Sequence, residues 1–282
     1  MIILDTIDVR LLSKMPKELL NRPLKELDRA YIRKHIKAVT FDIDGVVVPV
    51  GTRIKEDGTG TNLVIKTNPL SPKMISLILE LKKYLYINFS SGRALLYLQN
   101  FLGEILWDKV SICGENGNFI LMNGKVRQII SYDEKYFQKI ANIKEEIKKL
   151  AKKRRGLILG FEPKHVILTV FTKGPVLEIE KIVKKYDRKR ELYCLWSGEG
   201  YDIGHKKTSK ATALKYVCKA LRINPKEMIT TGNNLNDKEM LEFGIGVSVD
   251  PKRVSAAYAI EKKRGILGGE VIAKHLLNAF RK

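Results

Sequence analysis

Cysteine is scarce in this sequence, and its three copies do not form a metal-binding or disulfide pattern. Cys113, Cys194 and Cys218 lie far apart, each within an apolar stretch. We therefore expect buried, reduced thiols. Reduced thiols are typical of the cytoplasm, which is where we expect the protein to be.

Long hydrophobic runs are absent as well. No stretch reaches the about 18 apolar residues that a membrane helix needs, so we expect no membrane partner. The first residues, MIILDTIDVRLLSK, contain acidic side chains and lack a basic head followed by an apolar segment, so we predict no signal peptide. The 282 residues contain no internal repeat and suffice for one large domain or two smaller ones.

Acidic residues are too few to balance the basic ones, with 31 Asp and Glu against 52 Lys and Arg, a net charge of +21. This excess favours an anionic partner without choosing between a phosphorylated metabolite, a nucleic acid and an acidic protein. The densest basic stretches, 144–155 and 181–190, have helical spacing with apolar residues opposite, which favours a solvated helix surface. Tyr186 is the one aromatic residue within these two stretches, fewer than a nucleic-acid stacking platform requires, so nucleic acid is a disfavoured partner that charge alone leaves open.

Short apolar strands alternate with helices through most of the chain. Ser71 and Pro72 form a standard helix start, and a second helix covers 210–221. This alternation predicts an α/β fold with a Rossmann-like, mostly parallel sheet covered on both faces. The predicted strands are 38–42, 85–89, 110–113, 228–231 and 245–249.

The middle of the chain has a different order of elements. Strands and helices there follow the order β-α-β-β-α-β, which is typical of a small α+β unit. We therefore predict an inserted α+β domain at 126–198, within a core formed by 38–125 and 199–282. Residues 1–37 are interpreted as a basic N-terminal extension, and 49–69 as a β-hairpin or flap.

Polar residues follow three of the predicted strands: Asp42, Ser91 and Asn233. Ligands of open α/β sheets bind at the carboxyl ends of strands. Each residue alone could be turn chemistry, since Asp, Ser and Asn favour turns. Three such ends, with Asp44 and Asp237 close behind, indicate a ligand site.

Asp42 and Asp44 lie two residues apart, with Gly45 permitting a tight turn behind them. Two carboxylates this close repel each other unless a cation or a proton lies between them. Mg²⁺ accepts one or two carboxylates together with phosphate oxygens. One carboxylate can attack phosphorus while its neighbour handles the proton. An Asp-rich turn at a strand end is the alternative interpretation.

Lys210 falls in the first turn of its helix, behind Thr208 or Ser209 as the N-cap. A cation there faces the positive end of the helix dipole, which costs a few tenths to about 1 kcal/mol. A bound anion would reverse the sign of that interaction. A surface lysine that tolerates the cost is the alternative.

Taken in order, four segments resemble the motifs of haloacid dehalogenase-like phosphatases. More narrowly, they are similar to the Cof-type and sucrose-phosphatase-like branch, which has a type IIB cap domain, and Glu115-Asn116-Gly117 is similar to a segment that precedes the cap in that branch. The resemblance covers about 38–282 and implies that 126–198 is the cap. The four segments are Asp42-Ile43-Asp44-Gly45, Ser91-Gly92-Arg93, Thr208-Ser209-Lys210-Ala211-Thr212-Ala213-Leu214 and Gly232-Asn233-Asn234-Leu235-Asn236-Asp237.

The resemblance implies an enzyme, a Mg²⁺-dependent phosphatase that hydrolyses a small phosphate ester, such as a sugar phosphate or a phosphorylated acid. Asp42 would be the nucleophile, Asp44 the general acid and base, and Lys210 the cation that balances charge. The implied phosphate-binding residues are Ser91, Gly92, Arg93 and Lys210; the implied Mg²⁺ ligands are Asp42, Asp44, Asn233 and Asp237; and the implied supporting residues are Gly45, Gly232 and Asn236.

One position departs from the family pattern, because Asn233 stands where the family usually has an Asp that holds Mg²⁺. The amide removes one negative charge from the site. Together with the basic 1–37 extension, Asn233 leaves open a catalytically weakened member that acts as a binding or regulatory protein. The net charge alone leaves open a phosphatase directed at nucleic acid. The sequence does not indicate an oligomeric state.

Overall fold

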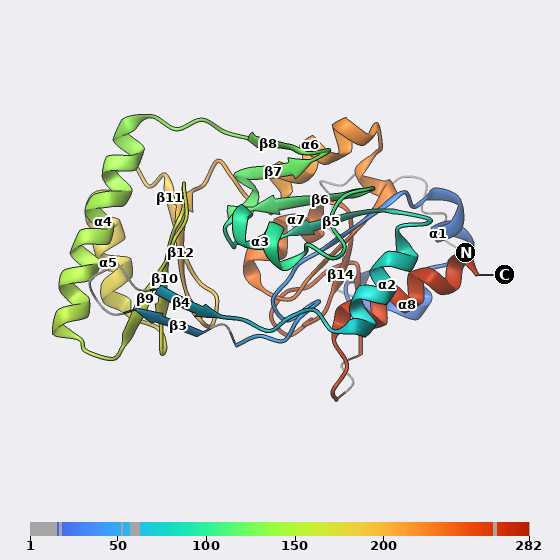
Figure 1. Cartoon of the computed structure of the whole chain (residues 1–282), viewed down its shortest axis with the longest axis horizontal. Coiled ribbons are helices and arrows are strands. Elements are labelled where there is room, and N and C mark those ends of the chain that lie inside the picture. The colour runs from blue at the N-terminus through green and yellow to red at the C-terminus, as the bar shows by residue number, and fades with distance from the viewer. Residues whose placement is uncertain (1–15, 17–18, 52, 57–62, 262–263, 282) are drawn as a thin grey trace.

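A nine-stranded, mostly parallel sheet forms the core of the molecule (Figure 1). The computed structural model describes residues 16, 19–51, 53–56, 63–261 and 264–281. All neighbouring strands pair in parallel except β6 with β7 and β7 with β8, which confirms the predicted sheet type. The strand order is β1 (Arg22–Pro23), β15 (Tyr258–Ala259), β14 (Ile245–Ser248), β13 (Met228–Gly232), β2 (Ala38–Phe41), β5 (Tyr86–Ser90), β6 (Val110–Gly114), β7 (Phe119–Met122) and β8 (Lys125–Gln128).

Helices cover both faces of this sheet, because its central strands are apolar on both sides. Every residue of β2 is buried, as expected for an inner strand of a parallel sheet. On one face lie α1 (Arg29–His35), α2 (Pro72–Leu81), α3 (Leu95–Phe101) and α8 (Gly268–Phe280); on the other lie α6 (Lys210–Leu221) and α7 (Lys238–Phe243). Short 3₁₀ helices occur at η3 (Leu24–Glu26), η4 (Glu115–Gly117), η5 (Pro225–Glu227) and η6 (Leu235–Asp237).

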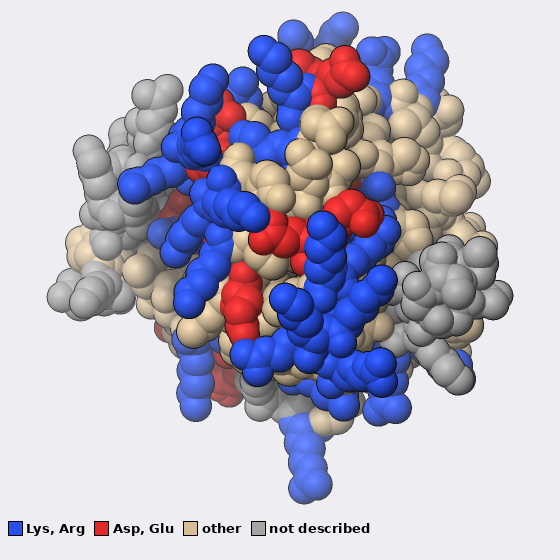
Figure 2. Space-filling view, turned by 90° about the vertical axis from the view of Figure 1, so that its left-hand side faces the viewer, with Lys and Arg blue, Asp and Glu red and all other residues tan. Residues whose placement is uncertain are grey.

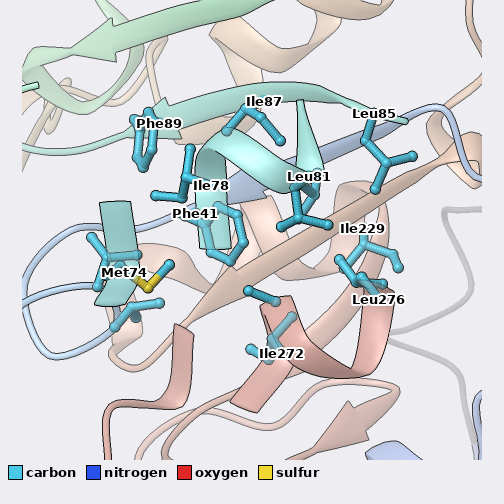
Figure 3. Close-up of a cluster of buried hydrophobic side chains, with 14 of the residues drawn as sticks. Phe41, Met74, Ile78, Leu81, Leu85, Ile87, Phe89, Ile229, Ile272 and Leu276 are labelled. Carbon is cyan, nitrogen blue, oxygen red and sulfur yellow. The ribbon is translucent and has the colours of Figure 1, made fainter. Parts of the chain in front are cut away.

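The start of α2 shows how local sequence and packing agree. Ser71 caps the helix by accepting a hydrogen bond of 3.1 Å from the Met74 amide, as its sequence predicts. Met74, Ile78 and Leu81 then face the sheet and are completely buried (Figure 3). Fully burying such a side chain contributes about 1.5–3 kcal/mol, so this face of α2 fixes the helix on the core.

The described part of the N-terminal segment belongs to the core, which differs from the interpretation of 1–37 as an extension. Strand β1 pairs with β15 at one edge of the sheet. Leu24, Leu27, Ile32 and Ile36 are buried in the main hydrophobic cluster. These apolar residues are spaced too irregularly to be recognised as a core element without the partner surface of α8.

A second sheet, antiparallel and four-stranded, forms a cap domain with two helices on one face (Figure 1, left). Its own hydrophobic cluster joins the sheet to the helices. This arrangement confirms the predicted α/β core with an α+β cap. The strand order is β11 (Leu192–Trp196), β12 (Gly200–His205), β10 (Leu168–Thr172) and β9 (Ile158–Glu162), and the helices are α4 (Glu134–Lys153) and α5 (Leu177–Tyr186).

Two strands lie on the other side of the predicted boundaries at 126 and 198. Strand β8, expected in the cap, pairs with β7 in the core sheet. Strand β12, expected in the core, pairs with β10 and β11 in the cap. The glycines of β12 concealed it, although they are needed there: a Cβ on Gly200 would lie 2.5 Å from the Val170 carbonyl oxygen.

A separate β-hairpin forms within 49–69, as expected, and it lies against the cap sheet. Its strands β3 (Arg53–Glu56) and β4 (Leu63–Lys66) are antiparallel, and β3 contacts β9. Residues 52 and 57–62 lie outside the described part of the chain.

The three cysteines are free thiols, as predicted. Cys113 and Cys218 are buried, but Cys194 on β11 is partly exposed, so the expectation of three buried thiols was wrong for this residue. Among the described strands, β11 pairs with β12 only and forms an edge of the cap sheet. None of the described helices combines the length and hydropathy needed to cross a bilayer.

Candidate active site

Three neighbouring strands deliver polar residues to one edge of the core sheet. Asp42 follows β2, Ser91 follows β5 and Asn233 follows β13, and these strands lie side by side in the order β13, β2, β5. All three residues line one cavity. The structure thus brings together the strand-end residues that the sequence singled out.

Lys210 connects two of the carboxylates. Its Nζ lies 2.6 Å from Asp42 Oδ1 and 2.5 Å from Asp237 Oδ1, and its side chain is completely buried. Ser209 is the N-cap of α6, so Lys210 does occupy the first helical position. The two carboxylates offset the unfavourable interaction with the helix dipole. Burial by itself lowers the pKa of Lys210, but the charges of Asp237 and Asp42 outweigh it and raise the pKa, so the ammonium stays charged.

Asp42 is buried between charges of both signs. Burial and the neighbouring Asp237 raise its pKa, while Lys210 acts in the opposite direction without cancelling them. A carboxylate perturbed in this way inside a cavity is a candidate functional group. Among the described residues, Asp42 Oδ2 receives no hydrogen bond and so is available to a ligand.

Asp237 has no exposed surface and bonds only to protein donors. Besides Lys210, it accepts hydrogen bonds from the backbone amides of Asn233 (2.8 Å) and Asn234 (3.1 Å). A Cβ on Gly232 would lie 2.4 Å from Asp237 Cβ, which explains the glycine at the end of β13. Asp237 therefore holds the lysine and the β13 turn, and it does not line the cavity.

Asp44 forms a bidentate ion pair with Arg93, at 2.7 Å from Nε to Oδ2 and 2.5 Å from Nη2 to Oδ1. Its backbone carbonyl accepts a hydrogen bond of 2.9 Å from Asn233 Nδ2. Gly45 has a φ of +80°, and a Cβ there would lie 2.1 Å from the same Nδ2. The turn after β2 is thus shaped around Asn233.

The loop at Ser91 is fixed by the segment after β6. The Ser91 amide donates to the Cys113 carbonyl (2.9 Å), and the Ser91 carbonyl accepts from the Asn116 amide (3.0 Å). Ser91 Oγ accepts from the Arg93 amide at 3.3 Å, a weak bond that leaves the hydroxyl proton free to donate into the cavity.

The cavity lies between core and cap and has a volume of about 110 Å³. Of the predicted residues, Asp42, Asp44, Ser91, Gly92, Arg93, Lys210, Asn233 and Asn236 line it, whereas Asp237, Gly45 and Gly232 do not. Sequence reasoning missed the cap side, since nothing in one sequence shows which face of the cap turns inward. The unpredicted lining residues are Val50, Glu162, Lys164, Thr169, Phe171, Ser197, Glu199, Gly200, Asp202, Asn234 and Arg253.

A hard divalent cation in this cavity would have to be held by different kinds of oxygen: carboxylate, backbone carbonyl and side-chain amide. Within the described residues, no three His, Cys, Asp or Glu side chains gather closely enough to hold a metal ion. Asp42, Asp44 and Asn233 line the cavity, and between them they can offer one carboxylate oxygen, one backbone carbonyl and one amide oxygen. Mg²⁺ commonly uses one or two carboxylates and completes its shell with water and phosphate oxygens, so this set fits it.

A parallel sheet with an inserted α+β cap and an Asp–Lys–Asp cluster at its carboxyl edge is similar to the architecture of haloacid dehalogenase-like proteins. The sequence model of the haloacid dehalogenase-like hydrolase family matches residues 158–256. The match covers about a third of the chain and agrees with the fold and the motifs, which are similar to those of haloacid dehalogenase-like hydrolases.

Several known proteins are similar to the chain. Phosphatase YwpJ of Bacillus subtilis is 35% identical over 99 residues, which cover 33% of this chain and 35% of YwpJ, so the match spans about a third of that relative. Phosphoglycolate phosphatase of Methanopyrus kandleri is 22% identical over 178 residues, 62% of this chain and 75% of that protein. Among solved structures, the C-terminal domain of Candida albicans trehalose-6-phosphate phosphatase has a TM-score of 0.67 at 15% identity, covering 92% of this chain and 97% of that one, which supports the fold.

Proposed function

We propose that the chain is a Mg²⁺-dependent phosphatase that hydrolyses a small phosphorylated metabolite through a phospho-aspartate on Asp42. The observation that carries the proposal is the buried Lys210, held between Asp42 and Asp237 at the carboxyl edge of the sheet. Phosphoryl transfer depends on positioning and on cations around the phosphate oxygens. Lys210 supplies one such cation beside the candidate nucleophile.

The residues present can carry out both halves of the reaction. Asp42 Oδ2 attacks phosphorus, the ester P–O bond breaks, and the leaving oxygen takes a proton from Asp44. Asp44 then removes a proton from water, which attacks phosphorus, releases inorganic phosphate and regenerates Asp42. Arg93 holds Asp44 in the present geometry, and a bound phosphate would compete for its guanidinium and free the carboxyl group.

Mg²⁺ bound by Asp42, the Asp44 carbonyl and Asn233 would neutralise charge on the phosphate oxygens. We assign Asp237 a positioning role instead of direct ligation, because both its oxygens already accept hydrogen bonds from the protein.

The cap side of the cavity suits a leaving group with several hydroxyls. Lys164, Thr169 and Asp202 line it with hydrogen-bonding groups, and Glu162 and Glu199 add two carboxylates. Sugar phosphates have such hydroxyls, and a similar structure bears the name trehalose-6-phosphate phosphatase. Phosphorylated acids are the second class, since a relative is named phosphoglycolate phosphatase.

The proposal is tested with a metabolite panel that includes trehalose 6-phosphate, hexose phosphates, phosphoglycolate and p-nitrophenyl phosphate, with Mg²⁺ present and released phosphate as the readout. Asp42→Asn should lower turnover on the order of 10³-fold or more, because an amide cannot form the acyl phosphate. The variant should stay folded, since burial already disfavours the charge that it removes. Asp108→Asn, the same change at an exposed loop position, is the control and should keep full activity. A folded Asp42→Asn protein that still hydrolyses esters would refute the mechanism.

A further inference from the structure

A buried carboxylate of the core binds the backbone of the cap. Glu115, in η4 directly after β6, has no exposed surface. Its Oε1 accepts from the His165 amide (2.9 Å), and its Oε2 accepts from the amides of Val166 (2.8 Å) and Ile167 (3.3 Å). The His165 ring lies 3.1 Å from the same carboxylate. One core side chain thus fixes the turn between β9 and β10.

The backbone around Glu115 is held in an unusual conformation. Glu115, Asn116 and Gly117 have φ values of 49°, 53° and 88°, three successive residues in the left-handed region. Non-glycine residues seldom adopt it, and where they do the surroundings enforce it. A Cβ on Gly117 would lie 2.1 Å from the Ser209 carbonyl, so the segment presses against the start of α6.

The same segment bonds the loop that carries Ser91. The Glu115 amide donates to the Arg93 carbonyl (2.9 Å), and the Asn116 amide donates to the Ser91 carbonyl (3.0 Å). Asn116 Nδ2 also reaches Asp202 Oδ2 on the cap at 3.2 Å. The segment therefore joins both sides of the cavity.

The cap turn held by Glu115 carries a cation into the cavity. Lys164 immediately precedes His165, and its side chain is 2% exposed. Its Nζ lies 2.5 Å from Thr169 Oγ1 and 3.2 Å from Glu162 Oε2, and all three residues line the cavity. The position of Lys164 relative to the Ser91 loop thus depends on the contacts of Glu115.

We propose that Glu115 is a positioning residue that places Lys164 over the phosphate site, so that it governs selectivity among substrates without touching them. The inference rests on the proposed function. It implies that Glu115 affects kcat/KM only for esters whose leaving group contacts the cap. Cleavage of the phosphate ester bond itself depends on Asp42 and Lys210.

The first measurement needs no activity. Glu115→Gln keeps the shape of the side chain but removes the charge and one acceptor oxygen, so the amides of 165–167 should exchange hydrogen about tenfold faster or more. Glu134→Gln, the same change on an exposed position of α4, should leave that exchange unchanged. Unchanged exchange in Glu115→Gln would overturn the proposal. Glu115→Asp, which withdraws the carboxylate by one methylene, serves the same comparison if Glu115→Gln does not fold.

The second measurement compares p-nitrophenyl phosphate with the metabolite that the wild type cleaves fastest. In Glu115→Gln, kcat/KM for the metabolite should fall about tenfold or more and that for p-nitrophenyl phosphate less than about threefold. In a Lys164→Met background, Glu115→Gln should cause no further loss of selectivity, because Glu115 acts through Lys164. Equal losses on both esters, or independent effects of the two substitutions, would overturn the positioning role. A wild type that cleaves no ester would refute the proposed function instead, and the exchange measurement would still decide whether Glu115 fixes the turn.

Discussion

Asn233 is the residue at which this chain departs most clearly from the haloacid dehalogenase-like motifs that it resembles. Its Nδ2 donates to the Asp44 carbonyl, an oxygen that we assign to the metal site, and it packs where a Cβ on Gly45 would collide. In this geometry the amide nitrogen bridges two elements without any cation. A carboxylate at 233 could not do so, because it has no donor and would face the carbonyl oxygen directly.

We therefore expect Asn233→Asp to make the protein more dependent on Mg²⁺. Without the ion, the variant loses a hydrogen bond and gains repulsion from Asp42, so its Tm should fall by a few degrees, about 2–4 °C per kcal/mol. With Mg²⁺, the added carboxylate should tighten binding by at most about 1–3 kcal/mol and lower the concentration that gives half-maximal activity.

A Mg²⁺ titration followed by both activity and Tm distinguishes three cases. An unchanged half-saturation point would mean that Asn233 only shapes the turn. If the wild type shows almost no phosphatase activity at any Mg²⁺ concentration and Asn233→Asp restores it, the catalytically weakened, regulatory alternative would be supported.

Residues on the core side of the cavity could be predicted from the sequence, because strand ends converge at one edge of a parallel sheet. Asp42, Ser91 and Asn233 follow from that rule alone. Lys164 and Asp202 could not be predicted, since their position depends on how the cap sheet packs over the core. The hydrogen bonds of Asp237 were not predictable either: only the structure shows that its oxygens accept from the lysine and two backbone amides.

At the scale of elements, helix starts were predictable and the cap boundaries were not. Ser71 and Ser209 act as N-caps by local chemistry that a sequence shows directly. Strand β8, by contrast, is exposed along its whole length, and only its pairing with β7 assigns it to the core. Its sequence carries no apolar face that would indicate which sheet it joins.

Removing the cap tests whether the core can hydrolyse phosphate esters without it. The chain crosses between them at neighbouring points, since Tyr132 and Thr208 lie in hydrogen-bond contact at 3.2 Å. Replacing 133–207 by a short Gly-Ser linker keeps β8 in the core and removes β12 with its partners. We expect hydrolysis of p-nitrophenyl phosphate to persist within about 10–100-fold of the wild type, while differences among metabolites shrink, because lids of this kind exclude water and complete the site.

Full retention of metabolite selectivity by the core alone would contradict the role given to the cap. The control keeps residues 133–207 and has a Gly-Ser pair inserted after Asp108, in an exposed loop. It measures the effect of inserting Gly and Ser residues alone.

At the scale of the whole molecule, positive charge is visible over the outer face of the cap (Figure 2). Some of these cations are paired with acidic residues: Lys148 with Glu145 (2.7 Å), Lys185 with Glu146 (2.8 Å) and Arg154 with Glu178 (2.6 Å). Interleaved acidic residues of this kind break up the continuous cationic track that a phosphate backbone would follow. The surface therefore favours a solvated helix face over a nucleic-acid site.

We expect the protein to bind heparin at about 50 mM salt and to leave it by about 0.3 M, because screening removes a diffuse attraction. Fluorescence anisotropy with single- and double-stranded DNA and RNA oligomers at 150 mM salt should give Kd values in the range of about 10⁻⁶–10⁻⁴ M, with no preference among them. A preference of about tenfold or more for one oligomer would support the nucleic-acid-directed alternative.

The outermost strands of the nine-stranded sheet, β1 and β8, disfavour the pairing of sheets from separate molecules. An unpaired strand edge offers free amides and carbonyls to any similar edge, which is how sheets from separate chains fuse into aggregates. Strand β1 is two residues long and ends in Pro23, which has no amide hydrogen to donate, and β8 places Lys125 and Arg127 at the opposite edge. Each edge thus discourages a further strand, one by lacking a donor and the other by like-charge repulsion between copies. Both edges of the sheet that carries the candidate active-site residues therefore disfavour growth by added strands.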